Sequence, residues 1–170
     1  IVKSQINFQK NDFHNINDFS LDSNLELNGV DLVTTKFLLI LDDNPPVKIQ
    51  IESLKKQNEA LIISVPTNTT FVKIITEVKI YPSTNNSLEG LYQSNNMFCT
   101  QCEAEGFRKI TWFPDRPDSL SIFTVRIEVA DKFNTILCNG NLIEEGIIKS
   151  ENGKGDRLFK ICLLYTSPSP

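Results

Sequence analysis

The residues of this chain that could support the most kinds of chemistry lie in one short segment, Cys-Thr-Gln-Cys-Glu-Ala-Glu, at positions 99–105. Its two thiols, Cys99 and Cys102, have the spacing of half a zinc site or of a redox pair, and they also suit two reduced thiols at a strand end. Three polar side chains, Gln101, Glu103 and Glu105, accompany the thiols. These side chains fit either a solvated loop or the polar floor of a binding pocket.

The cysteine pair lacks the partners that a metal or redox site needs. A structural zinc ion takes four ligands, commonly from two close pairs, whereas Cys138 and Cys162 stand apart in the sequence. A thioredoxin-type pair needs a helix that begins directly after a strand, because the helix N-terminus lowers the thiol pKa. The sequence has no such βαβ pattern. We therefore favour two reduced thiols and expect this chain to bind no metal.

The single histidine, His14, lies in an Asn/Asp-rich segment far from the cysteines. A lone histidine in a polar stretch is expected on the surface. The count also excludes a His-rich metal site, and it excludes a Ser-His-Asp triad near the cysteine motif.

The acidic side chains would share one face of an extended segment, since Gln101, Glu103 and Glu105 are two residues apart. A Gln-x-Glu face at a strand end has the chemistry to receive a cation or an ammonium group. Charged side chains are nevertheless mostly solvent-exposed in proteins. From the residues alone, a solvated loop is the favoured interpretation.

The composition argues against several classes of partner. The 170 residues carry a formal net charge of −4, and no run of basic residues exceeds two, which argues against a nucleic-acid partner. No apolar stretch reaches the length that spans a bilayer, so no membrane is expected. Four scattered cysteines are too few for a disulfide scaffold and suit a reducing compartment, so we expect a cytoplasmic location.

The hydrophobic pattern predicts an all-β chain with mainly antiparallel strands, arranged as a sandwich or sheet. The clearest strands are Phe71 to Ile80, rich in β-branched residues, and Ser121 to Val129, in which Phe123, Val125 and Ile127 are expected to point inward. Further strand candidates are Val33 to Leu41, Val47 to Ile51, Ala60 to Val65, Ile110 to Phe113 and Thr135 to Cys138. Turn sequences, among them Asn28-Gly29, Asn139-Gly140 and Asn152-Gly153, separate the apolar runs.

Residues 1–160 are assigned to one β-rich domain and residues 161–170 to a tail. The tail ends in Ser-Pro-Ser-Pro, which cannot continue a sheet because proline has no backbone N–H to donate. The tail is therefore expected to be disordered, or an artefact at the end of the sequence, and to lie outside the fold.

Several strings of residues resemble, in order, the bacterial aminopeptidase N family of gluzincin zinc aminopeptidases. They are LELNGVDL (25–32), NSLEGLY (86–92), MFCTQCEAEGFRKIT (97–111), DRPD (115–118), FTVRIE (123–128) and CNGN (138–141). The resemblance covers about residues 1–155, and Trp112-Phe113-Pro114 is bulkier than the family's aromatic-Leu. Ile1 corresponds to a position inside the family's second strand, so the domain is expected to be truncated at its start.

The resemblance implies a saddle-like, β-rich N-terminal domain that leans on a thermolysin-like catalytic domain. In the family, the glutamate that matches Glu103 contacts the free α-amino group at the N-terminus of the peptide substrate. The glutamine that matches Gln101 lines the pocket for the first side chain. An exopeptidase must locate a positive N-terminus, and a desolvated carboxylate facing that ammonium is suited to the task.

The family's zinc motif, His-Glu-x-x-His with a distant Glu, and its Gly-Ala-Met-Glu-Asn loop are both absent from the sequence. Zinc is therefore expected in the intact enzyme with ligands outside this chain, and the chain by itself is expected to be inactive. Two other classes stay open: a stand-alone, non-catalytic β-rich binding module, and a small zinc- or redox-active cysteine protein.

Overall fold

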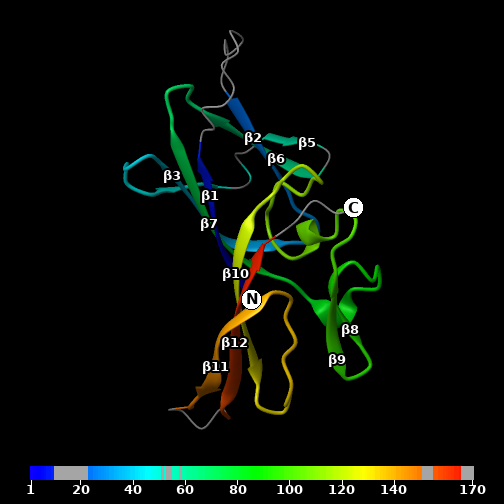
Figure 1. The fold of residues 1–170 in the computed structure, drawn as a ribbon. Coiled ribbons are helices and arrows are strands. Elements are labelled where there is room, and N and C mark those ends of the chain that lie inside the picture. The colour runs from blue at the N-terminus through cyan, green and yellow to red at the C-terminus, as the bar shows by residue number, and fades with distance from the viewer. Residues whose placement is uncertain (10–22, 51, 53–54, 58, 151–154, 166–170) are drawn as a thin grey trace. The chain divides into compact units, whose positions relative to one another are not determined.

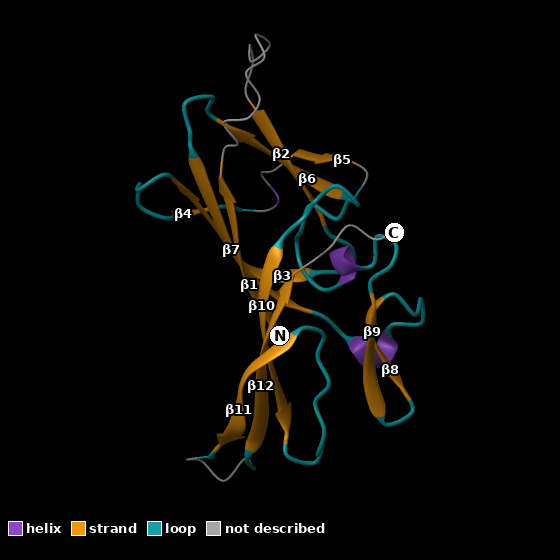
Figure 2. Cartoon of the chain, in the orientation of Figure 1, coloured by secondary structure: helices purple, strands orange, loops and turns teal. Residues whose placement is uncertain are grey.

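The computed structural model describes residues 1–9, 23–50, 52, 55–57, 59–150 and 155–165. The chain forms two compact units, Ile1–Arg116 and Pro117–Pro170. Both are built from antiparallel strands, and the helical elements among the described residues are short 3-10 turns, such as η2 (Pro82–Thr84) and η3 (Phe107–Lys109) (Figure 1, Figure 2). The all-β, mainly antiparallel fold predicted from the sequence is confirmed.

The first unit contains two sheets and a hairpin. The strand order is β1-β7-β3-β4 in the larger sheet and β2-β6-β5 in the smaller one, and β8 pairs with β9 in the hairpin. The bounds are β1 Val2–Gln9, β2 Ser23–Asn28, β3 Val33–Leu41, β4 Val47–Lys48, β5 Lys55–Gln57, β6 Ala60–Val65, β7 Phe71–Lys79, β8 Gly90–Ser94 and β9 Met97–Gln101.

The two sheets of the first unit share one hydrophobic core. Every second side chain of β7 from Val72 to Val78 is buried, which is the period of a strand with one face against a core. Phe37 of β3 and Leu61 of β6 join that cluster, as does Trp112 from outside any strand. The segment that follows the hairpin and the loop packs into this core through Trp112.

Three of the predicted strands match their predicted ranges closely. The predicted strands at 33–41 and 60–65 are confirmed to the residue, and the one at 71–80 ends one residue earlier. The predicted strand Val47 to Ile51 shrinks to the two residues of β4. The prediction of a strand at Thr135 to Cys138 is wrong, because that apolar run pairs with no neighbouring strand in the part of the chain described.

The predicted strand Ile110 to Phe113 is also wrong, since this segment inserts into the core. The Ile110 amide donates to the carbonyl of Phe107 and closes η3, and Phe113 forms a single antiparallel bridge with Asn28. Between them the Trp112 indole lies against Gly29, and its Nε1 donates to Thr34 Oγ1 at 2.8 Å. A large side chain in the core outweighs the local preference for an extended strand.

Replacing Gly29 by alanine is expected to destabilise the first unit. A Cβ atom at this position would lie 2.3 Å from two ring carbons of Trp112, whose residue is only 5% exposed. Overpacking of this kind costs about 1–3 kcal/mol. The midpoint of urea unfolding should therefore fall. In a Trp112→Leu background, which removes the clashing ring, the cost of Gly29→Ala should shrink. Equal costs in both backgrounds would contradict the contact.

The second unit is a three-stranded sheet of order β10-β12-β11. Its strands are β10 Ile122–Ala130, β11 Asn141–Ile148 and β12 Arg157–Tyr165. Alternate residues of β10, including Phe123, Val125 and Ile127, are the less exposed ones, so the predicted inward face is confirmed.

The prediction that residues 161–170 form a tail outside the fold is wrong for residues 161–165. Residues 161–165 belong to β12, the central strand of the sheet, and Cys162 is 2% exposed. The register pairs Cys162 with Val125 on one side and with Leu142 on the other. Residues 161–163 thus pair with a strand on each side. The boundary placed at residue 160 falls inside β12. Residues 166–170 lie outside the described residues.

Candidate functional site

Gln101 and Glu103 lie where the β8–β9 hairpin gives way to a tight loop. Gln101 is the last residue of β9 and pairs with Gly90. The chain then turns through residues 102–106, where the Gly106 amide donates to the carbonyl of Cys102 at 3.0 Å. The peptide bond between Glu103 and Ala104 is cis. The loop leads directly into η3.

The structure brings Gln101 and Glu103 together and separates Glu105 from them. Gln101 Nε2 donates to the backbone carbonyl of Glu103 at 3.0 Å, and both side chains are exposed. Among the described residues, the Glu103 carboxylate has no hydrogen-bonding or ion-pair partner. The carboxylate of Glu105, in contrast, pairs with the Arg108 guanidinium at 3.2 Å. The shared acidic face predicted from the residue spacing therefore divides into one unpaired and one neutralised carboxylate.

Two glycines allow the hairpin and the loop to approach each other. A Cβ atom on Gly106 would lie 2.5 Å from the carbonyl oxygen of Gln101 and 3.1 Å from the Cα of Cys102. A Cβ on Gly90, where φ is +68°, would lie 2.6 Å from the Cβ of Lys109. The positions of the Gln101 and Glu103 backbones thus depend on the absence of side chains at two neighbouring residues.

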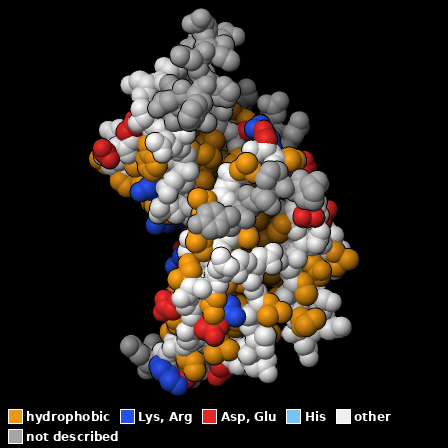
Figure 3. All heavy atoms as spheres, viewed as in Figure 1, with side chains coloured by type: hydrophobic (Ala, Val, Ile, Leu, Met, Phe, Trp, Pro, Cys, Tyr) orange, Lys and Arg blue, Asp and Glu red, His pale blue; other side chains and the backbone are white. Residues whose placement is uncertain are grey.

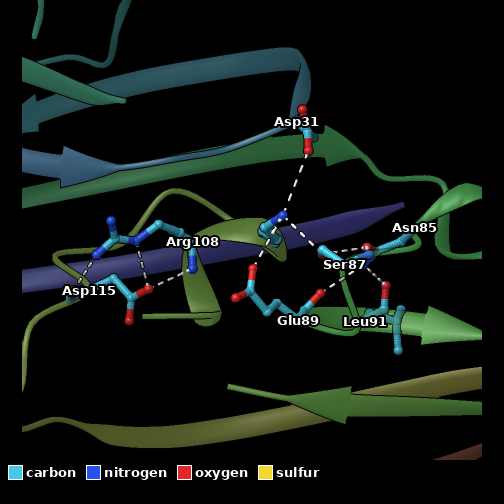
Figure 4. Close-up of polar contacts among 8 residues, drawn as sticks. Asp31, Asn85, Ser87, Glu89, Leu91, Arg108 and Asp115 are labelled. Atoms are coloured by element: carbon cyan, nitrogen blue, oxygen red, sulfur yellow. Dashed lines mark hydrogen bonds and ion pairs between the residues drawn. The ribbon is translucent and has the colours of Figure 1, made fainter. Parts of the chain in front are cut away.

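A largely buried ion pair holds the far end of the loop (Figure 4). The Asp115 carboxylate accepts from the backbone amide of Arg108 at 2.9 Å and from its Nε at 3.1 Å. Arg108 also donates to the backbone carbonyl of Asp115, and the two side chains are 15% and 12% exposed. The Asp115 amide donates to Asn28 Oδ1. Arg108 thereby connects the loop to the core through Asp115 and Asn28.

A second polar network surrounds Lys109, the last residue of η3 (Figure 4). Its Nζ donates to Ser87 Oγ at 3.0 Å and lies 3.5 Å from Glu89 and 4.0 Å from Asp31. Asn85 organises the same segment: its Nδ2 donates to two backbone carbonyls, and its Oδ1 accepts from the amide and hydroxyl of Ser87.

A hollow of about 270 Å³ lies beside this network, lined by residues that include Asp31, Tyr81, Asn85 and Lys109. Neither Gln101 nor Glu103 is among its described lining residues. The types and spacing of these residues did not predict that they form a site. The string NSLEGLY at 86–92 was the signal available for part of the network.

The cysteines are free thiols. Cys99 lies within β9 and Cys102 directly after it. Burial, together with the negative charge of Asp115, raises the pKa of the Cys102 thiol. A raised pKa favours the protonated thiol, whereas redox and metal-binding pairs need thiolates.

In the second unit, Cys138 and Cys162, which are separate in the sequence, are in side-chain contact. Burial and the hydrogen bond with Cys162 raise the pKa of Cys138 to about 11. The fold therefore brings together two cysteines that sequence spacing treats as isolated, and the raised pKa favours the protonated thiol of Cys138.

The remaining expectations from the sequence concern the histidine, a metal site and a membrane span. His14 lies outside the described residues. Among the residues that the structure describes, no three His, Cys, Asp or Glu side chains are grouped to hold a metal ion, and no helix is long and apolar enough to span a membrane. Basic and acidic side chains are scattered over the face in Figure 3 without a continuous patch of either sign.

Known proteins are similar to this chain in sequence and in fold. The sequence matches the Peptidase M1 N-terminal domain over residues 2–160. It is 43% identical over 151 residues to aminopeptidase N of Escherichia coli (strain K12), which covers 85% of this chain and 16% of that protein. Aminopeptidase N of Caulobacter vibrioides is 60% identical over 73 residues, covering 43% of this chain and 8% of that protein.

A solved structure is similar over nearly the whole chain. The structure of Legionella pneumophila aminopeptidase A in complex with aspartic acid matches with a TM-score of 0.72 at 26% identity. The match covers 95% of this chain and 17% of that chain. The chain thus spans less than a fifth of the length of these relatives.

Proposed function

The chain belongs to the peptidase M1 N-terminal domain family, and from this premise we propose that it is the domain that recognises the substrate amine in a zinc-dependent aminopeptidase. Its ligand is the N-terminus of a peptide, and the intact protein removes N-terminal residues from peptides. In this proposal Glu103 binds the α-ammonium group and Gln101 lines the pocket for the first side chain.

The observation that carries this proposal is the unpaired carboxylate of Glu103. Among the described residues it has no partner, although the loop around it is held by the Gly106–Cys102 hydrogen bond and by the Arg108–Asp115 ion pair. A fixed backbone that presents an exposed, unneutralised carboxylate is prepared to receive a cation. Because Glu105 already pairs with Arg108, the site offers one free negative charge rather than two.

The proposed recognition works by pairing one charge with one charge. An α-ammonium group donates up to three hydrogen bonds, and bonds between ionised partners are shorter and stronger than neutral ones. When the substrate excludes water, this pairing penalises peptides whose N-terminus is blocked, because the carboxylate would then be desolvated without a partner. Gln101 lies two residues from Glu103, and its side-chain amide donates to the Glu103 backbone carbonyl. In the proposed complex Gln101 contacts the first side chain of the peptide, which is attached to the α-carbon that carries the ammonium group.

The described residues of this chain do not fit a zinc site. They contain no cluster of three potential ligands, and the complete sequence contains a single histidine. We propose that zinc is bound by the remainder of the intact protein, where it supplies the Lewis acid for hydrolysis. The task of this chain is to bind and orient the substrate amine.

We also propose that the second unit packs against that remainder, the thermolysin-like catalytic domain. Large apolar side chains stand exposed on its strands and loops, among them Ile122, Leu142, Ile143 and Ile147 at 53–68% exposure. Large exposed apolar side chains gathered on one small sheet are candidates for an interaction surface. The free thiols suit a cytoplasmic location, which cell fractionation would test.

The chain expressed as given is expected to hydrolyse no aminoacyl substrate. Its single histidine cannot supply a His-Glu-x-x-His zinc motif. The measurement is an assay with chromogenic alanine and arginine amides in the presence of added zinc. Hydrolysis that persists through repurification and is lost on chelation would overturn the assignment of catalysis to another part of the protein.

A stand-alone binding module without catalysis is the alternative function. The two are distinguished by extending the reading frame of the source DNA beyond residue 170. A downstream His-Glu-x-x-His motif supports the aminopeptidase, and a stop codon without such a motif supports the module. Replacing Glu103 in the full-length protein then tests amine recognition directly.

A further inference from the structure

Three Asn-Gly dipeptides occur in the chain, and the fold places the two described ones in opposite environments. They are Asn28-Gly29, Asn139-Gly140 and Asn152-Gly153, and the third lies outside the described residues. Asn-Gly is chemically labile because glycine has no side chain to hinder its own amide nitrogen. That nitrogen can attack the side-chain carbonyl carbon of the asparagine before it, and asparagine is accordingly a thermolabile residue.

The reaction needs no partner beyond water. The glycine nitrogen forms a bond to Cγ of the asparagine, the bond from Cγ to the amide nitrogen breaks, and ammonia leaves with the proton that the glycine nitrogen loses. Water then opens the resulting succinimide at either carbonyl and yields aspartate or isoaspartate. The reaction involves no oxidation or reduction. Its rate depends on how freely the asparagine side chain and the next backbone amide can approach each other.

In the first unit the fold blocks this meeting. Asn28 is 7% exposed, its amide and carbonyl both bond to Phe113, and its Oδ1 accepts from the amide of Asp115 at 3.1 Å. The attacking atom is also engaged, because the Gly29 amide donates to the carbonyl of Glu59 at 2.9 Å. The Trp112 ring covers the same glycine. Reaction at Asn28 would require all these contacts to open together.

In the second unit the same dipeptide is unprotected. Asn139 and Gly140 are both exposed and lie at the end of a stretch, residues 133–140, that forms neither helix nor strand (Figure 2). Among the described residues, neither the Asn139 side chain nor the Gly140 amide has a hydrogen-bonding partner. We propose that Asn139 is a site of spontaneous deamidation, converting to aspartate and isoaspartate, in a chain whose Asn28 is protected.

The product would alter the edge of the second sheet. Gly140, at φ +94°, sits so close to β12 that a Cβ atom there would lie 2.3 Å from the carbonyl oxygen of Leu163. The next residue, Asn141, starts β11 and pairs with Leu163. Isoaspartate adds a methylene group to the backbone at this point, so the first pairs of β11, an edge strand, should loosen.

The test is to age the full-length protein at 37 °C in mildly alkaline buffer and to map its peptides by mass spectrometry. Trypsin cleavage after Lys132 and Lys149 separates the Asn139 site from Asn152, and fragment spectra locate the converted residue. Isoaspartate is detected by enzymatic methylation with a labelled methyl donor. In the native protein, Asn139 should convert at least about tenfold faster than Asn28, and both should convert at similar rates in denaturant.

Two variants make the readout specific. Asn139→Gln should abolish methylation of the 133–149 peptide, because a six-membered intermediate forms far more slowly. Asn139→Asp introduces the charge of the product without the extra methylene, so hydrogen exchange in β11 should stay near that of the unaged protein, whereas ageing should raise it. Conversion of Asn28 at the rate of Asn139, or an Asn139 amide that persists in the native protein but is lost in denaturant, would overturn the proposal.

Discussion

Replacing Glu103 by alanine in the full-length protein is expected to lower kcat/KM by roughly 30-fold to several thousand-fold. In the proposed complex the Glu103 carboxylate pairs with the substrate ammonium in a space from which the peptide excludes water. Removing one partner of such a desolvated pair typically costs about 2–5 kcal/mol. The measurement is the steady-state kinetics of each variant on alanine and leucine substrates.

The charge of Glu103, rather than its shape, should be the important property. Glu103→Gln preserves the size of the side chain and loses the charge, so it should also be severely impaired. A competitive inhibitor with a free α-amine should bind the wild type more tightly than its analogue without the amine, and that difference should disappear in Glu103→Gln. A Glu103→Ala enzyme within about threefold of wild type would show that this acid does not anchor the amine.

Neighbouring residues provide the matched controls. Glu105→Ala removes an acid two positions away that already pairs with Arg108, so it should change kcat/KM little. Gln101→Ala should alter which first residue is preferred, with a smaller overall loss. If all three variants behave alike and near wild type, the loop is simply solvated surface.

Replacing Asp115 by alanine is expected to destabilise the loop that carries Glu103. Its carboxylate accepts from the amide and Nε of Arg108, and both side chains are mostly buried, at 12% and 15% exposure. Leaving one member of a buried pair alone costs about 3–5 kcal/mol. The expected result is a lower thermal midpoint and faster hydrogen exchange over residues 102–109. Arg108 would lose its buried carboxylate partner and, among the described residues, keep only the exposed Glu105.

An exposed ion pair in the same unit is the control for Asp115. Lys3 lies 3.9 Å from Glu77, and its side chain is 77% exposed. Water and salt screen such a pair, so Lys3→Ala should change stability by no more than about 1 kcal/mol. Comparable losses for Asp115→Ala and Lys3→Ala would indicate that the Arg108–Asp115 pair is no stronger than a surface contact.

Strands were predictable where one face of a segment is buried against the core. The runs at 33–41, 60–65 and 71–79 show this, because a period of two in the side chains reports directly on burial. The strands β8, β9 and β11 were not predicted, and neither were β1, β2, β5 and β12. Burial hardly alternates along β8, β9 and β11, whose residues are largely exposed, so a period of two gives no signal there.

The candidate site was predictable in its residues but not in its electrostatics. Gln101 and Glu103 were identified through the family strings around them, whereas spacing alone placed Glu105 on the same face. In the folded chain Arg108 neutralises Glu105 and leaves Glu103 unpaired. The network of Lys109 with Asp31, Ser87 and Glu89 was not foreseen either, because its members come from three separate segments.

The sequence by itself determined the all-β class, the family and the residues that we propose for amine recognition, because these depend on local periodicity and on strings of adjacent residues. Only the tertiary structure decided which acid is free, which thiols meet and which Asn-Gly is protected. Those properties depend on contacts across long separations, such as Asn28 with Phe113 and Cys138 with Cys162. Closing such loops costs chain entropy that local pattern does not reveal, and the burial of apolar side chains within each unit offsets it.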